Sequence, residues 1–173
     1  PPKVTRKNHI YGTQTAIVTW QEKEEIWTEG YGRIKIKFHW DRHGPHDDHS
    51  SCWVRVASSW AGQNWGCLSI PRVGHEVVVC FLNGDPDSPL VIGSVYNGLN
   101  TPPSLPENPT HSLWKSQSTP ESEGFNAIRF EDKAGEEDIF MHAQKDVTTM
   151  TQDCQTHEIM TGSVSTTIHR GDR

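Results

Sequence analysis

The sequence predicts an all-β fold, with a small closed barrel followed by a connector and the start of a β-stranded needle. Short segments of alternating apolar and polar residues recur along the chain, and Gly, Pro and Asn separate them. The composition agrees, because the 173 residues include 14 Gly, 11 Pro and seven Trp, and no stretch has the spacing of an amphipathic helix. Only 33% of residues are hydrophobic, so we expect a soluble chain with one real core.

The clearest strand signal lies in residues 32–40. Ile34, Ile36 and Phe38 fall on one face of this segment, as the two-residue period of a strand requires. The other face carries polar residues: Arg33, Lys35, Lys37 and His39. We therefore expect a half-buried strand whose three apolar side chains point into a core.

Four further segments have strand-like composition, with turn residues between them: 15–20, 52–57, 76–82 and 90–96. Five short strands within roughly 85 residues suggest a small closed barrel, and the OB-fold is the five-stranded candidate. The sequence therefore predicts an antiparallel OB-fold barrel over residues 8–99.

Residues 100–124 have the composition of a connector. Five prolines lie among Ser, Thr, Asn and Glu, at positions 102, 103, 106, 109 and 120. Such a segment favours extended or irregular backbone. We therefore expect a proline-rich linker over 100–124.

A second β module is predicted over residues 125–173. Residues 126–132 and 138–144 alternate like strands, with a hairpin turn at 133–136. The predicted strands 147–150 and 164–168 each offer only one or two aliphatic residues, too few for a private core. Residues 159–162 recur loosely as 168–171. Thin repeating strands become stable when several chains pool them around one axis, so we expect a homotrimer with a needle-like β-helix or β-prism.

Several ordered motifs resemble one known family. They are Phe38-His39-Trp40-Asp41-Arg42 and the segments 51–56, 60–62, 70–74, 84–89 and 125–133. Together they resemble the VgrG family, the spike of the bacterial type VI secretion system, which is similar to the hub and spike of contractile phage tails. The resemblance implies a trimer with OB-fold domains at its neck and a β-stranded needle below.

The resemblance also implies a function and partners. It implies a structural spike that punctures target envelopes and delivers effectors, with a tube protein, a tip-capping protein and effectors as partners and transient contact with the target membrane. The protein would lie in the bacterial cytoplasm before firing and be secreted through the apparatus. A contractile phage tail spike remains the alternative. We expect that both ends of the chain are cut from a longer protein, with a hub before Pro1 and more needle after Arg173.

The densest group of potential metal ligands lies within 39–52: His39, His43, His46, His49 and Cys52. A structural zinc site needs four ligands in a compact pattern, often with a CxxC pair. His39 belongs to the predicted strand, and residues 46–49 look like a solvated loop. We therefore expect a polar loop, with no metal and no cofactor.

Two acidic runs are candidates for the paired carboxylates of glycoside cleavage: Glu22, Glu24 and Glu25, and then Glu136, Glu137 and Asp138. Neighbouring acids on turns are usually only solvated, and the sequence lacks the hydrolase, metalloprotease and P-loop motifs. A connector of about 25 residues is also far too short for the lysozyme domain that some phage relatives insert. We therefore expect no enzyme and no catalytic residues, unless an effector domain follows Arg173.

A nucleic-acid-binding OB module is the alternative from another class, since Arg33, Lys35 and Lys37 form a basic strand face. The formal charge of −6 and the absence of stacking aromatics on that face argue against it, and acidic residues of a neighbouring protein are the favoured partner. Trp53, Trp60 and Trp65 are interpreted as core or subunit-interface anchors. The four cysteines show no CxxC spacing and are expected as buried free thiols.

Overall fold

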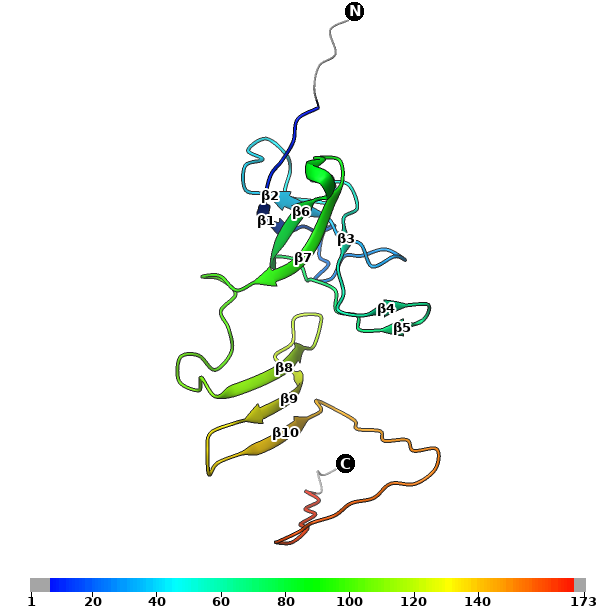
Figure 1. The fold of residues 1–173 in the computed structure, drawn as a ribbon, viewed down its shortest axis with the longest axis vertical. Coiled ribbons are helices and arrows are strands. Elements are labelled where there is room, and N and C mark those ends of the chain that lie inside the picture. The colour runs from blue at the N-terminus through cyan, green and yellow to red at the C-terminus, as the bar shows by residue number, and fades with distance from the viewer. Residues whose placement is uncertain (1–6, 170–173) are drawn as a thin grey trace, which may run out of the picture.

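The computed structural model describes residues 7–169 and contains strands, one short 3-10 helix and loops (Figure 1). The strands are β1 (Thr13–Val18), β2 (Ile36–Phe38), β3 (Arg55–Val56), β4 (Ala61–Gly62), β5 (Trp65–Gly66), β6 (Glu76–Phe81), β7 (Pro89–Val95), β8 (His111–Gln117), β9 (Phe125–Glu131) and β10 (Asp138–His142). The 3-10 helix η1 (Leu82–Gly84) joins β6 to β7. The all-β class is therefore confirmed. Within 7–169, no helix has the length and apolar character needed to cross a membrane.

Five strands form a closed barrel in the upper half of Figure 1. They are hydrogen-bonded in the order β2-β1-β6-β7-β3. Ile34 and Val54, which lie just before β2 and β3, exchange two backbone hydrogen bonds of 2.9 and 2.8 Å and so join the two ends of this order. Closure removes the free strand edges, and this strand order agrees with the predicted OB-fold.

The barrel core consists of nine buried side chains: Ala16, Val18, Ile34, Ile36, Val54, Val77, Val79, Phe81 and Val91. They come from alternating strand positions, because successive residues of a strand point to opposite faces. Ile34 and Ile36 are fully buried, as predicted, and Phe38 is half-buried against Phe81 with ring centroids 5.6 Å apart.

The prediction that every pairing in the barrel is antiparallel is wrong. β3 runs parallel to β7, with Arg55 opposite Leu90 and Val56 opposite Val91. Alternating hydrophobicity reports which face of a strand is buried but not the direction of its neighbour. The long excursion between β3 and β6, which includes the β4–β5 hairpin, allows β3 to close the barrel in this direction.

A second, three-stranded antiparallel sheet lies below the barrel in Figure 1, in the order β10-β9-β8. β8 forms within 111–117, inside the stretch that the sequence assigned to a linker. The only large apolar residues of β8, Leu113 and Trp114, are adjacent and therefore point to opposite faces. The strand thus lacks the alternation that marks the others, and the prolines around it favoured a linker. The irregular connection between barrel and sheet is therefore shorter than predicted.

Two barrel side chains hold the turn that follows β8. Arg72 donates a hydrogen bond of 2.6 Å from Nη2 to the Gln117 carbonyl oxygen. The Glu25 carboxylate accepts hydrogen bonds from the Thr119 hydroxyl and, at 2.6 Å, from the Glu121 backbone N–H. The Thr119 hydroxyl, the Glu121 N–H and the Arg72 charge lower the pKa of Glu25. These contacts fix the second sheet against the barrel.

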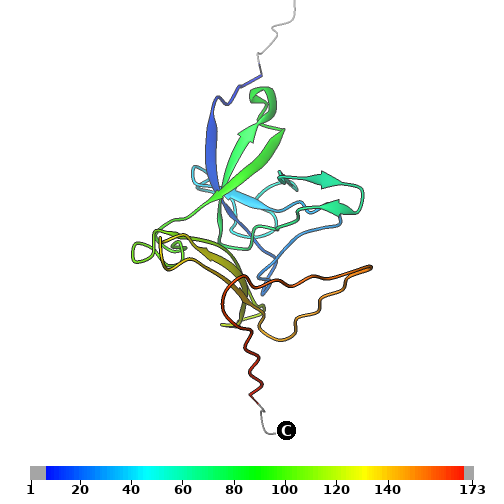
Figure 2. The ribbon, with the colours of Figure 1, turned by 60° about the horizontal axis from the view of Figure 1, so that its bottom comes forward.

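Residues 143–169 run as an extended tail away from β10 and then downward (Figure 2). The predicted strands 147–150 and 164–168 do not form in the single chain. Within the described residues, no strand pairs with this tail. Extended backbone needs a neighbouring strand to form ladder hydrogen bonds. Residues 170 and 171, which complete the predicted repeat, lie outside the described residues.

Candidate subunit interface

One face of the β8–β10 sheet is apolar. Because neighbouring strands are in register, its side chains form two cross-strand rows. Trp114, Ile128 and Met141 make one row. Phe130 and Ile139 make the other, with Ser112 at its β8 end. We call these five large side chains the needle face.

The needle face is open to solvent in the single chain. Trp114, Ile139 and Met141 are 68%, 69% and 70% exposed, and Ile128 and Phe130 are 43% and 44% exposed. Single exposed apolar residues are ordinary, but a contiguous group of this size on a soluble protein marks an interaction surface. This sheet therefore has the pattern of a buried face without the second layer that would bury it.

The opposite face of the same sheet carries internally paired polar groups together with Leu113, Phe125 and Phe140. Arg129 and Asp138 form an ion pair of 2.8 Å, and His111 Nε2 lies 2.9 Å from the Glu131 carboxylate. The Thr110 hydroxyl contributes most to lowering the pKa of Glu131, with His111 adding to the effect. These charged pairs can remain in water, so the two faces of the sheet have different requirements.

The tail continues the pattern of the needle face. Its large apolar residues are all exposed: Val147, Met150, Ile159, Met160, Val164 and Ile168. All six remain exposed in the single chain, so their burial requires surfaces from elsewhere.

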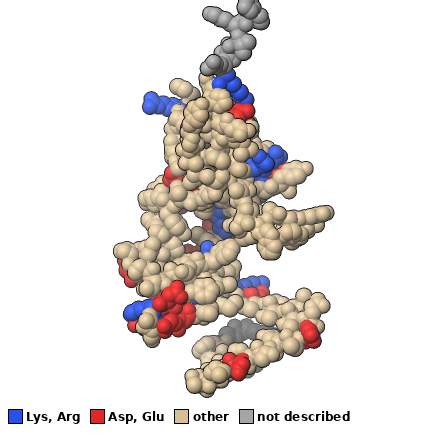
Figure 3. Space-filling view, viewed as in Figure 1, with Lys and Arg blue, Asp and Glu red and all other residues tan. Residues whose placement is uncertain are grey.

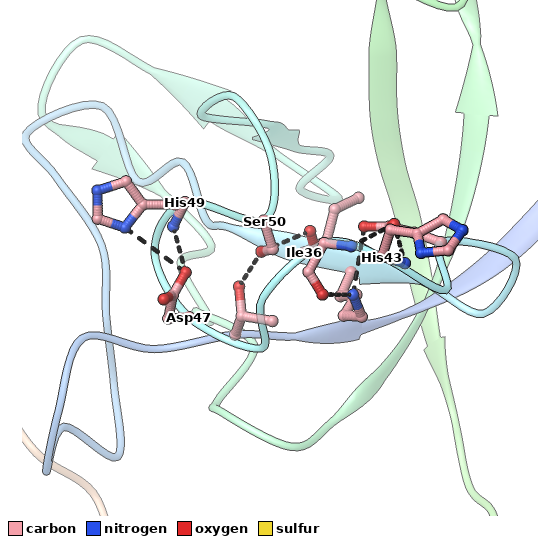
Figure 4. A network of polar contacts seen from close by, with 9 residues as sticks. Ile36, His43, Asp47, His49 and Ser50 are labelled. Atoms are coloured by element: carbon pink, nitrogen blue, oxygen red, sulfur yellow. Dashed lines mark hydrogen bonds and ion pairs between the residues drawn. The ribbon is translucent and has the colours of Figure 1, made fainter.

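Of the five residues in the predicted metal-ligand group, only His49 belongs to a cluster of potential ligands in the structure, and no described residues outside 47–49 form such a cluster. Asp47, Asp48 and His49 present ligand atoms within 4.8 Å of one another. Figure 4 shows His49 beside Asp47 in the loop, and His49 Nδ1 lies 2.9 Å from the Asp48 carboxylate. His39 lies elsewhere, 3.7 Å from Glu76, and Cys52 is exposed. An exposed His-carboxylate turn satisfies itself and lacks the four converging ligands of a structural zinc site.

Hydrogen bonds between partly buried groups hold the loop after β2 (Figure 4). Ser50 donates a hydrogen bond of 3.0 Å to the Ile36 carbonyl oxygen, and its hydroxyl lies 2.8 Å from that of the buried Thr19. Asp41 accepts 2.8 Å and 3.2 Å hydrogen bonds from the Gly44 and His43 backbones. The Gly44 N–H is the main cause that lowers the pKa of Asp41, followed by Lys37.

The predicted basic face does not present three free cations. Lys37 is only 6% exposed, and its Nζ contacts the Gly44 carbonyl oxygen and the Asp41 carboxylate. Lys35 donates a 2.8 Å hydrogen bond to the Ser51 carbonyl oxygen and lies over Trp53. Arg33 pairs with Glu29 at 2.9 Å. Each cation has an intramolecular partner, which leaves little of the face for phosphates.

The remaining candidates lie apart. Glu25 belongs to the contact between barrel and sheet, whereas Glu136 pairs with Lys133 in the turn at 133–136. Trp53 is half-buried beside Trp27, but Trp60 and Trp65 are 66% and 57% exposed and do not serve as core anchors. The four cysteines are free but not buried, because Cys52 and Cys154 are exposed and the other two are half-buried.

Sequence reasoning missed Trp114 and the needle face as one surface. The signal was the shared alternation of Ile128 with Phe130 and of Ile139 with Met141. Only the register across the turn at 133–136 and the presence of β8 show that all five side chains lie on the same side.

Two family models match the chain. Residues 14–96 match the type VI secretion system/phage-baseplate injector OB domain, which coincides with the barrel strands. Residues 112–171 match the bacteriophage T4 gp5 C-terminal trimerisation domain, which spans the β8–β10 sheet and the tail. The surface that the single chain leaves open therefore lies in a segment that resembles a trimerisation module.

Similar proteins cover most of this chain. The type VI secretion system spike protein VgrG4b of Pseudomonas aeruginosa is 53% identical over 147 residues, which are 84% of this chain and 18% of the relative. VgrG1b of the same organism is 50% identical over 153 residues, which are 86% of this chain and 20% of the relative. The actin cross-linking toxin VgrG1 of Vibrio cholerae is 50% identical over 141 residues, which are 81% of this chain and 13% of the relative. The chain spans a fifth or less of the length of these curated relatives, and over these residues it belongs to the VgrG family of type VI secretion spike proteins.

Proposed function

We propose that this chain is the barrel-to-needle segment of a trimeric type VI secretion spike, which is driven through a target envelope and delivers effectors. One observation carries the proposal: the needle face is exposed in one chain and lies within the residues that match a trimerisation domain. Three copies around one axis would bury this face and pair the free edges of the sheet.

The chain contributes stiffness and has no catalytic role of its own. The barrel is closed by its backbone, and Arg72 and Glu25 tie the second sheet to it. A force along the long axis would thus pass between the modules through hydrogen-bonded structure. Closed β structure has no free edges to unzip.

The partners follow from the family and belong to the proposal. They are a tube protein, a tip-capping protein, effectors and, transiently, the target membrane. The protein would be held in the bacterial cytoplasm until firing and then be secreted. The relative named as an actin cross-linking toxin supports the idea that some spikes of this kind carry an effector in the same chain. The relatives near 50% identity are type VI spike proteins, which favours the secretion spike over a phage tail spike.

Nucleic-acid binding is the alternative that the proposal excludes. Lys35, Lys37 and Arg33 already have intramolecular partners, and the formal charge is −6. We expect no submicromolar binding of single-stranded oligonucleotides at physiological salt. Tight binding that weakens steeply with added salt would overturn this part of the proposal.

Two neighbouring substitutions on opposite faces of β10 test the proposal. Met141→Gln places an amide on the needle face, whereas Phe140→Gln makes the same change on the opposite face of the strand. Light scattering should show that Met141→Gln dissociates into monomers at concentrations where the parent chain and Phe140→Gln remain trimeric. In the host bacterium, Met141→Gln should also lower spike secretion. Equal behaviour of the two variants would contradict the assignment of the needle face.

A further inference from the structure

The β4–β5 hairpin carries an apolar feature that the barrel and the needle face do not use. Trp60 and Trp65 pack against each other edge to face, with ring centroids 5.0 Å apart. Both rings remain more than half exposed, and Tyr31 and Leu68 beside them are 86% and 78% exposed. Tryptophan is the residue type most enriched at the energetic centres of interfaces.

The hairpin is built to hold this pair in place. Gly62 lies beneath the Trp65 ring, so a Cβ there would collide with the indole. At Gly66, where φ is 135°, a Cβ would lie 2.5 Å from the Trp60 carbonyl oxygen. The Cys67 N–H donates a 2.9 Å hydrogen bond to that oxygen. A preorganised aromatic pair loses little conformational freedom when it binds.

The same chain has a hollow of complementary character where the barrel meets the second sheet. The hollow has a volume of about 870 Å³, and its lining includes Ile26, Val56, Ile70, Tyr96, Leu113 and Trp114. We call it the junction groove. It is of the size that accommodates a drug-sized molecule, and so it has room for indole rings. Arg72 and Lys115 also line it, and cations pack favourably on tryptophan faces.

The hairpin borders the groove on its own copy, because Leu68 and Ile70 line both the groove and the hollow beside the tryptophan pair. In Figure 3 a hollow opens toward the viewer between the barrel and the second sheet, while the hairpin protrudes sideways as an uncharged projection. The hairpin and its flanks, residues 56–71, contain no Asp, Glu, Lys or Arg. Interface centres are depleted of charge in the same way.

Threefold symmetry needs two such different surfaces. In a ring, each copy presents one patch to the copy ahead and a different, complementary patch to the copy behind. The junction groove is bounded by β8, which lies within the matched trimerisation domain, so it is continuous with the needle face. We propose that the β4–β5 hairpin of one copy seats Trp60 and Trp65 in the junction groove of the next copy.

This inference rests on the proposed trimer and adds a second set of contacts at the level of the barrel. Its occupant is another copy of this chain. The hairpin contact would couple the rotation of each barrel to its neighbour, because the groove includes residues of both modules. The needle would then be held by its own face below and by three hairpins above.

A photo-cross-linking experiment tests the contact in the full chain. Gln63, at the hairpin tip, is replaced by p-benzoylphenylalanine, and unlabelled chains are mixed with isotope-labelled ones before irradiation. We expect cross-links between copies that map to 113–117 in the groove. The matched control carries the same probe at Asp87, at the far end of the barrel beside η1, and should not mark the groove.

Sedimentation of a double variant supplies an independent readout. Trp60→Ala with Trp65→Ala should weaken trimer association about tenfold or more, while Tyr11→Ala, which removes another exposed aromatic ring, should not. If the parent chain is trimeric but the probe at 63 reacts only within its own chain or outside the groove, the hairpin contact is refuted and the trimer stands. If the parent chain is monomeric at all concentrations, both proposals fail.

Discussion

The barrel and the β8–β10 sheet use the same local pattern in opposite ways. In both, apolar side chains occupy alternate strand positions, but those of β6 are buried in a closed barrel and those of β9 lie in solvent at 43% and 44% exposure. The barrel closes on itself through Ile34 and Val54, whereas the second sheet ends in two free edges. The barrel is thus a complete folding unit, and the needle sheet is one part of a unit that several chains complete.

The largest expected effect comes from breaking the barrel core. Ile36→Asp would bury a charge without a partner, which costs several kcal/mol, comparable with the whole stability of about 5–15 kcal/mol of a small domain. The variant should lose the near-ultraviolet circular dichroism of the folded chain at room temperature. The control is Leu99→Asp at a residue 94% exposed, which should unfold like the parent. Normal thermal unfolding of Ile36→Asp would refute the inward assignment.

Removal of the tail should separate the two regions. A chain that ends at Gln144 keeps all nine core residues and all ten strands but lacks the exposed tail aliphatics. We expect its thermal unfolding to change little, because no barrel residue is removed, while its trimer dissociation constant rises at least tenfold. A shortened chain as fully trimeric as the parent would place the main subunit contacts elsewhere.

A smaller effect is expected at the contact between the regions. Glu25→Ala removes the acceptor of the Thr119 hydroxyl and of the Glu121 N–H. The Glu121 amide should then exchange its hydrogen faster, by roughly three- to tenfold, because its N–H loses an exposed acceptor. Glu24→Ala, at the preceding position, is the control. Unchanged exchange at Glu121 would show that the turn is held by other contacts.

The smallest effect concerns pH and His75, next to β6 at the junction. Burial, followed by the charge of Arg72, lowers the pKa of His75, and its Nδ1 accepts a 3.3 Å hydrogen bond from the Arg72 N–H. The unfolded chain therefore binds this proton more readily than the folded chain. The stability contributed by neutral His75 is therefore complete above the ordinary histidine pKa of about 6.5 and is lost as pH falls below that value. Urea unfolding between pH 7.5 and 5.5 should show this slope, and His75→Asn should flatten it. An unchanged slope would assign it to another group.

The sequence predicted the barrel better than the needle for a physical reason. Core strands such as β1 and β6 report their burial through alternation within one chain, so their positions were recognisable to within a few residues. The parallel direction of β3 against β7 depends on the path of the chain between them, which no local pattern encodes. The Trp60–Trp65 hairpin was missed because its strands are two residues long and its order comes from a turn and two rings.

Sequence spacing was a poor guide to the positions of the polar candidate residues. His39 and His49 are ten residues apart in the sequence, yet one lies beside Glu76 and the other in a loop with Asp47 and Asp48. Likewise, Lys37 alternates with apolar residues as an exposed cation would, but the loop at 41–50 folds back and buries it. Sequence spacing fixes the face of a strand, whereas a returning loop decides whether that face meets water.

Sedimentation equilibrium of the full chain over a wide concentration range tests the central claim most directly. If the needle face is a subunit surface, the chain will form a species of about three times 19.5 kDa, with dissociation at low concentration. A well-folded monomer of 19.5 kDa that persists at high concentration would contradict the account, because the five apolar side chains of the needle face would then lie in water in the functional state.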